Sequence, residues 1–252
     1  MSDFDRNVAA RGIGAARATA IDVGLRTYMI RIYNYMASGV ALTGVVSWLT
    51  YSQAATTDIN GNLTGLTPFG QAIYGGPLMI ALFLGTLGIV FFLSFRINKL
   101  QAGTALILFM LYAALLGVML SSVFLTYTHG SIARTFFISA ASFGALSLYG
   151  YTTQRDLSPI GSFLVMGLFG LILAMVVNMF LKSTGLDFAI SAIGVLIFAG
   201  LTAWDTQKIK EMYSANDDGT VSGRKAVMGA LTLYLDFINL FLFLLRFMGD
   251  RR

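Results

Sequence analysis

Two aspartates are the residues of this sequence best placed to do chemistry in a nonpolar setting. Asp236 lies near the middle of residues 226–245, an otherwise uncharged run, and Asp205 ends the apolar run before it. At about 1.5 Å per residue, a helix of that length crosses a hydrocarbon core of roughly 30 Å. A carboxylate at such depth is costly, and it usually handles protons or ions. Asp205 and Asp236 are therefore candidates for a pair that binds protons or cations.

Polar residues at helical spacing mark one face of each of these two segments. Thr232 and Asn239 fall near the face of Asp236, and Thr202 falls near the face of Asp205. A polar stripe on an otherwise apolar helix turns toward protein or water and away from lipid. These three residues are the candidate lining of an ion pathway.

The composition predicts an integral membrane protein. The chain has 252 residues, of which 56% are apolar and 12% charged, with no cysteine. The charged fraction is about half that of a soluble domain, and several apolar runs are long enough to cross a bilayer. The basic residues are scattered singly between these runs, which argues against nucleic-acid binding. The charged head, residues 1–31, is predicted to be a cytoplasmic tail.

The hydrophobic pattern predicts an all-α bundle of seven transmembrane helices in residues 32–252. The runs are continuously apolar and do not alternate, which excludes a β-barrel. Ala140 and Gly144 form a pair of small residues one helical turn apart, which favours close helix packing. The expected spans cover residues 32–50, 74–95, 102–124, 135–152, 160–181, 188–204 and 226–245.

The lysine and arginine distribution favours a cytoplasmic N-terminus. With seven crossings, most of these residues fall on the cytoplasmic side, except those of the C-terminal tail. A rival topology has six crossings, with residues 226–245 entering the membrane and returning, which places the tail inside. We prefer seven crossings because residues 226–245 are long enough to span and late charges weigh less than early ones.

Two motifs carry a family resemblance. Residues 204–209 read WDTQKI, and residues 233–241 read LYLDFINLF, followed by LLR at 244–246. These motifs resemble the signature of the Bax inhibitor-1 (TMBIM) family, which includes bacterial YccA-like proteins. Trp204 departs from the tyrosine or phenylalanine usual at that position. The number and order of the spans are also similar to those of the family.

The resemblance implies a seven-helix protein, with a central last helix, that acts as a pH-sensitive calcium leak. By motif match, Asp205 and Asp236 would share a proton as the pH sensor. Arg96, which ends the second apolar run, would be the arginine that latches onto them in the closed state. Calcium would be the transported or transiently bound ion, with Asp205 and Asp236 among its oxygen ligands, and no other cofactor is implied.

Physical chemistry is consistent with that implication. Two buried carboxylates close together cannot both ionise cheaply, so the pair is expected to retain one proton. An arginine nearby favours the ionised form, so the arginine and the proton compete. Acidification would then free Arg96 and open a path for a cation.

The sequence bears on three other interpretations. An intramembrane aspartyl protease is disfavoured, because the expected Gly-x-Gly-Asp motif is replaced by Leu233-Tyr234-Leu235-Asp236, so no enzyme is predicted. A regulatory partner of a membrane-bound quality-control protease would use the head and the loop 208–225 as contact surfaces. The aspartates could also serve only to hold helices together.

If the cell is bacterial, the expected location is the plasma (inner) membrane.

Overall fold

The computed structural model describes residues 3–58 and 63–252, and helices account for most of them. One short antiparallel hairpin pairs Ala55 with Leu66 and Thr57 with Leu63 within the predicted connection after the first span. The elements in chain order are α1 (Asp3–Ala54), β1 (Ala55–Thr57), β2 (Leu63–Leu66), α2 (Pro68–Tyr74), α3 (Pro77–Arg96), the 3₁₀ turn η1 (Ile97–Lys99), α4 (Ala102–Leu120), α5 (Val123–Thr126), α6 (His129–Thr152), α7 (Ser158–Leu181), α8 (Thr184–Glu211) and α9 (Gly219–Met248).

Local sequence explains where several helices begin. The side chains of Thr128, Ser183 and Asp218 accept hydrogen bonds from backbone N–H groups in the first turns of α6, α8 and α9. Such caps satisfy donors that the helix itself leaves unpaired. Each of the three prolines of the chain lies in the first turn of a helix, where its missing N–H costs nothing.

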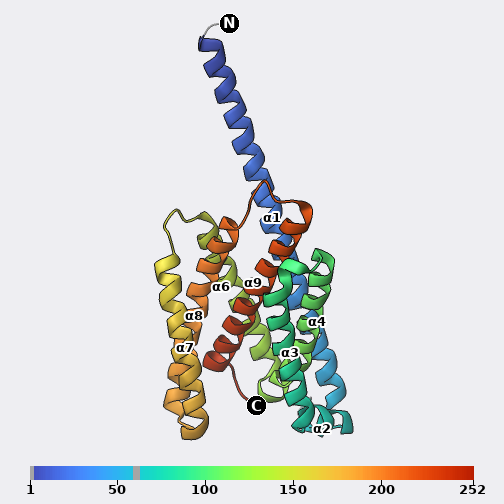
Figure 1. Ribbon diagram of the computed structural model, residues 1–252. Coiled ribbons are helices and arrows are strands. Elements are labelled where there is room, and N and C mark those ends of the chain that lie inside the picture. The colour runs from blue at the N-terminus through green and yellow to red at the C-terminus, as the bar shows by residue number, and fades with distance from the viewer. Residues whose placement is uncertain (1–2, 59–62) are drawn as a thin grey trace.

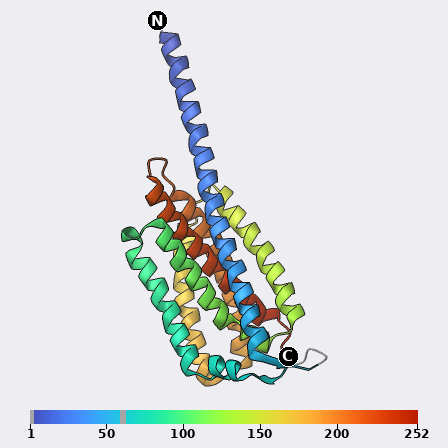
Figure 2. The ribbon, with the colours of Figure 1, turned by 90° about the vertical axis from the view of Figure 1, so that its right-hand side faces the viewer.

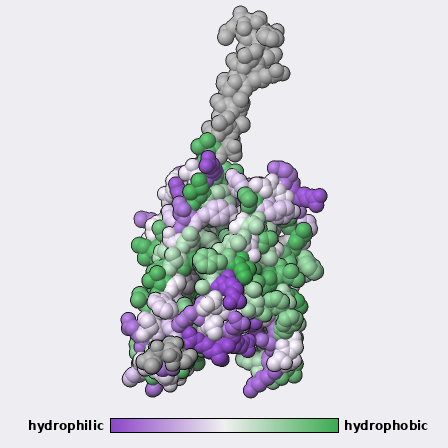
Figure 3. Space-filling model, turned by 180° about the vertical axis from the view of Figure 1, so that it is seen from behind, coloured by the Kyte–Doolittle hydropathy of each residue, from purple (hydrophilic) through white to green (hydrophobic). Residues whose placement is uncertain are grey.

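Six helical stretches of the described residues are long and apolar enough to cross a membrane. They correspond to six of the seven predicted spans, although the span predicted from residue 74 begins at Pro77, and they confirm the all-α membrane class. In Figure 3, apolar residues form a belt between two ends where hydrophilic residues gather. The six stretches are Pro77–Lys99, Ala102–Thr126, His129–Thr152, Ser158–Leu181, Thr184–Glu211 and Gly219–Met248.

The seventh predicted span, 32–50, lies inside α1. This segment is not apolar enough to be counted with the six stretches that could cross a membrane. Polar residues such as Asn34, Ser38 and Thr43 interrupt its apolar residues. Helix α1 is 52 residues long, and its first part stands outside the bundle in Figures 1 and 2. The predicted boundary between the head and the membrane domain therefore falls within one continuous helix.

Helix α9 lies at the centre of the bundle, as predicted. It packs against α8, α1, α6 and α4, and Figure 1 shows it between α8 on one side and α3 and α4 on the other. Of the six stretches that could cross a membrane, α9 is the most buried, because 67% of the residues in its apolar part lie inside the protein. The corresponding share is 11% for α3 and for α7. A charged residue in α9 is therefore shielded from lipid by other helices.

The closest approach of a glycine to the backbone of another helix is at Gly150 and not at Gly144. A Cβ added at Gly150 of α6 would lie 2.1 Å from the backbone oxygen of Ala203 in α8, so only glycine allows this contact. A Cβ added at Gly144 would meet no atom within 4 Å, and Ala140 is exposed. The predicted role of Ala140 and Gly144 in close packing is therefore wrong. The spacing of two small residues shows that they share a face of the helix, but it does not show whether that face contacts another helix.

The C-terminal tail lies at the end of the bundle opposite the loop that precedes α9. Arg246, in the last turn of α9, and Arg251 both form ion pairs with Asp187, at the start of α8. Arg251 also pairs with Tyr127, between α5 and α6, through a β-bridge. Helix α9 is one uninterrupted helix, so residues 226–245 do not turn back on themselves as the rival topology requires.

We expect the two ends of α9 to be labelled from opposite sides of the membrane. The natural chain has no cysteine, so single cysteines can be placed at the exposed Asn216 and after Arg252. In intact vesicles, an impermeant maleimide should modify one site before the membrane is permeabilised and the other only afterwards. Labelling of both sites from the same side would contradict the single crossing of α9.

Candidate functional site

The packing of α8 against α9 brings Asp205 and Asp236 together. Ile209 of α8 lies against Gly229 of α9, and Gly194 lies against Phe243, so the two helices run antiparallel in close contact. Helix α8 extends past the predicted end of its span, through Thr206 and Gln207, to Glu211. Because of this extension, Asp205 lies within the helix and beside the middle of α9. The two aspartates could meet only if α8 continued beyond its predicted end in this way.

The two carboxyl groups differ in burial but interact directly. Asp236 is 5% exposed, and its Oδ2 atom is buried without a hydrogen bond to any described residue. Asp205 is half-buried, and its carboxyl group lies within hydrogen-bonding range of that of Asp236. Ionised carboxylates only accept hydrogen bonds, so a bond between these two groups requires a shared proton.

The structure does not bring Arg96 to this pair. Arg96 ends α3 with an exposed side chain, and among the described residues it forms no ion pair with either aspartate. The cation whose charge acts on Asp205 is Lys208, one helical turn further along α8. The Lys208 ammonium also lies 5.0 Å from the centre of the Trp204 ring, where a cation is attracted to the aromatic face.

The three predicted lining residues lie on α8 and α9, and two of them are hydrogen-bonded within their own helices. The fully buried Thr202 hydroxyl donates to the Phe198 carbonyl at 2.7 Å. The Asn239 amide donates to the Leu235 carbonyl at 2.8 Å, and Thr232 is half-buried. Asn239 and Thr202 therefore have part of their hydrogen-bonding capacity occupied by backbone.

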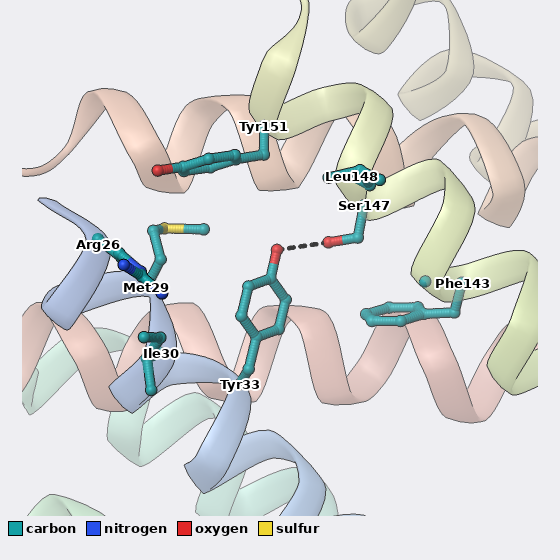
Figure 4. Close-up of a pocket in the computed structure, with 9 residues that line it drawn as sticks. Arg26, Met29, Ile30, Tyr33, Phe143, Ser147, Leu148 and Tyr151 are labelled. Carbon is teal, nitrogen blue, oxygen red and sulfur yellow. Dashed lines mark hydrogen bonds between the residues drawn. The ribbon is translucent and has the colours of Figure 1, made fainter. Parts of the chain in front are cut away.

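Sequence reasoning missed a chain of hydroxyl groups next to Asp205. The Tyr33 hydroxyl of α1 lies 2.6 Å from the Ser147 hydroxyl of α6, as Figure 4 shows, and Ser147 lies 2.9 Å from the Thr206 hydroxyl of α8. Thr206 in turn donates to the Thr202 carbonyl. The chain joins three helices beside the carboxyl pair. Its only sequence signal was the position of Thr206 inside the first motif.

Gln207, also in the first motif, fixes the loop that enters α7. Its side-chain oxygen accepts from the Leu157 N–H at 2.8 Å, and its side-chain nitrogen donates to the Arg155 carbonyl at 2.8 Å. Gln207 thus satisfies both a donor and an acceptor of that loop. The two residues that follow Asp205, Thr206 and Gln207, thus hold neighbouring segments in place, while Asp205 itself faces α9.

Thr43 of α1 makes a second joint, on the other side of α9. Its hydroxyl lies 2.6 Å from that of the fully buried Tyr234 and 2.9 Å from the Ala113 carbonyl of α4. Tyr234 precedes Asp236 by two residues in the second motif. The backbone that carries Asp236 is thereby tied to both α1 and α4.

The carboxyl pair supplies only part of a calcium coordination shell. Calcium takes six to eight oxygen ligands, whereas the described residues contain no cluster of three or more acidic, histidine or cysteine side chains. Two carboxylates with water and carbonyl oxygens suit a passing or weakly held cation better than a tightly held structural one.

The fold and this pair define a class: helical integral membrane proteins with two interacting carboxyl groups at the core of the bundle. A family model described as inhibitor of apoptosis-promoting Bax1 matches residues 25–252. The chain therefore belongs to the Bax inhibitor-1 family, as the two motifs indicated.

Several bacterial proteins are similar to the chain over most of its length. Protein RP147 of Rickettsia prowazekii is 52% identical over 92% of both chains. The inner membrane protein YbhL of Escherichia coli K12 is 48% identical over 91% of this chain and 94% of its own. A Caulobacter vibrioides protein is 43% identical over the full length of both chains.

We expect Asp236→Asn to leave thermal stability unchanged or to raise it. The amide has nearly the same shape, removes a like charge from beside Asp205 and can donate a hydrogen bond to it. The matched control is Asp187→Asn, which removes a carboxylate that lies between Arg246 and Arg251.

Loss of those partly exposed ion pairs should cost about 1 kcal/mol, or roughly 2–4 °C in melting temperature. The measurement is thermal unfolding of the purified proteins in detergent at neutral pH. A drop for Asp236→Asn as large as that for Asp187→Asn would show that Asp236 is held by a stabilising charge interaction.

Proposed function

We propose that this protein is a pH-sensitive leak channel for calcium, gated by protonation of the Asp205–Asp236 pair. The observation that carries the proposal is the direct interaction of two carboxyl groups at the buried interface of α8 and the central helix α9. Two adjacent carboxylates in a medium of low dielectric repel each other strongly. The pair is most stable when it shares a proton or binds a cation.

The pH dependence follows from competition for the same oxygens. At low pH the shared proton cancels most of the negative charge, and the pair has little attraction for an arginine. At higher pH the second negative charge draws in a cation, which can be Arg96 or a calcium ion. On this proposal calcium is the substrate that passes the pair, and the protein catalyses no reaction.

The packing of α3 supports the proposed latch role of Arg96. Helix α3 packs mainly on α4 and is one of the least buried helices of the bundle, so it can move at little cost. A cavity of about 250 Å³ separates α3 from Leu235 of α9, the residue before Asp236. Movement of α3 into this space would bring Arg96 toward the pair, and its return would reopen the path.

We also propose that α1 provides a seventh crossing and that its N-terminal end is cytoplasmic. Helix α1 packs along α4 and α9, both of which qualify as membrane-crossing helices. Its polar residues Thr43 and Ser47 are buried in the protein and do not face lipid. The excess of lysine and arginine at that end favours the cytoplasm. The name of YbhL supports location in the inner membrane of a bacterial cell.

Neutralising either aspartate should remove the pH dependence of calcium flux. Asp205→Asn and Asp236→Asn each mimic the protonated pair, so flux at neutral pH should rise to the level that the unmodified protein reaches at acidic pH. The measurement is calcium entry into proteoliposomes loaded with an indicator dye, over a pH series.

The control is Asp156→Asn, the same change at an acid in the loop before α7 that is fully exposed. This variant should keep the pH profile of the unmodified protein. An unchanged profile in both Asp205→Asn and Asp236→Asn would refute the proposed gate.

A second candidate function is regulation of a membrane-bound protease, for which α1 provides the supporting observation. Figures 1 and 2 show its N-terminal part extending beyond all other helices, where a partner could reach it. The head contains both acidic and basic residues, which suits contact with a polar protein surface.

Deletion of residues 2–20 separates the two functions. If the protein is a leak, calcium flux and its pH profile should be retained, because α1 from Tyr28 onward still packs in the core. If regulation is the function, the same deletion should abolish co-purification with the protease while the bundle remains folded. Loss of flux with retained protease binding would contradict both assignments.

A further inference from the structure

A hollow of about 570 Å³ lies between α1 and α6 at the end of the bundle from which the head projects. Figure 4 shows its lining side chains, with Tyr33 reaching across from α1 to Ser147 of α6. Both helices also pack on α9. The lining residues are Arg26, Met29, Ile30, Tyr33, Phe143, Gly144, Ser147, Leu148 and Tyr151.

The hollow exists because α1 and α6 are held apart along this stretch. Gly144 adds no side chain, and a Cβ there would meet only open space. The Tyr33–Ser147 hydrogen bond spans the gap and fixes its width. Ile30 and Leu148 at its edges are 48% and 62% exposed, so the hollow opens sideways toward the lipid that surrounds the apolar belt. An acyl chain can therefore enter it directly from the bilayer.

One end of the hollow is polar and positively charged. In Figure 4 the Tyr151 hydroxyl and Arg26 lie at the same end of the space, away from Phe143. Arg26 has an exposed side chain and is part of no ion pair among the described residues. Lys210 of α8 donates to the Tyr151 carbonyl, and its ammonium lies 5.8 Å from the centre of the Tyr151 ring. Two cations thus flank Tyr151.

We propose that this hollow binds an anionic phospholipid. Its acyl chain would lie against Met29, Ile30 and Leu148, and its phosphate would accept hydrogen bonds from Arg26. An arginine binds phosphate through several N–H groups at once, and its position at the end of an apolar slot matches the join between a lipid headgroup and its tail. A small inorganic anion would leave the apolar lining unused. The inference stands independently of calcium transport.

The first test compares lipids that differ only in headgroup. Native mass spectrometry of the full-length protein should detect phosphatidylglycerol bound about tenfold more tightly than phosphatidylcholine with the same chains, because the choline group of the second lipid adds a positive charge that offsets the phosphate and is repelled by Arg26 and Lys210. Arg26→Gln should abolish this preference. Arg31→Gln, a change at an exposed arginine of α1 outside the hollow, should retain it.

The second test fills the hollow without touching a charge. Gly144→Leu should lower the binding of both lipids, because its side chain occupies the space of the acyl chain. Gly170→Leu is the matched control, since a Cβ at Gly170 of α7 also meets open space but lies outside the hollow. Equal binding of the two lipids to the unmodified protein would overturn the proposal. Equal effects of Arg26→Gln and Arg31→Gln, or of the two leucine variants, would also overturn it.

Discussion

The fold depends on the cost of placing two carboxyl groups inside a membrane. Hydrocarbon offers them no hydrogen bonds, so they must be enclosed by protein or reached by water or ions. Helix α9 meets this requirement by lying between α8, α6, α1 and α4. These four helices surround α9, so Asp236 is buried in protein and shielded from lipid. The central position of the last helix is thus tied to the residue that it carries.

Hydroxyl and amide side chains hold the helices in the register that the pair needs. Ser147 links α6 to both α1 and α8, and Thr43 links α1 to α9 and α4. In an apolar environment a hydroxyl group without a hydrogen bond costs free energy. These contacts therefore specify which helices meet and at what depth in the bundle. The residues around the aspartates in the two motifs are therefore largely structural, which is why our proposal assigns proton or cation chemistry to the two acids alone.

Tight and loose packing are distributed unevenly around the core. Gly150 brings α6 against the backbone of α8, whereas Gly144 of the same helix faces the hollow shared with α1. Helix α3 on the other side is shallowly buried and separated from Leu235 by a cavity. The helices that carry the carboxyl pair are therefore the more closely packed part of the bundle, and the spaces lie beside α1 and α3.

The sequence alone determined the membrane class, six of the spans, and the identity of Asp205 and Asp236, because long apolar runs and an acid within them are local features. The two motifs also identified the family and the central last helix. Only the tertiary structure decided that Arg96 lies away from the pair, that Thr202 and Asn239 bond within their own helices, and that Gly150 packs closely while Gly144 does not. These outcomes depend on which faces of distant helices meet, and helical periodicity fixes the faces of one helix without fixing their partners.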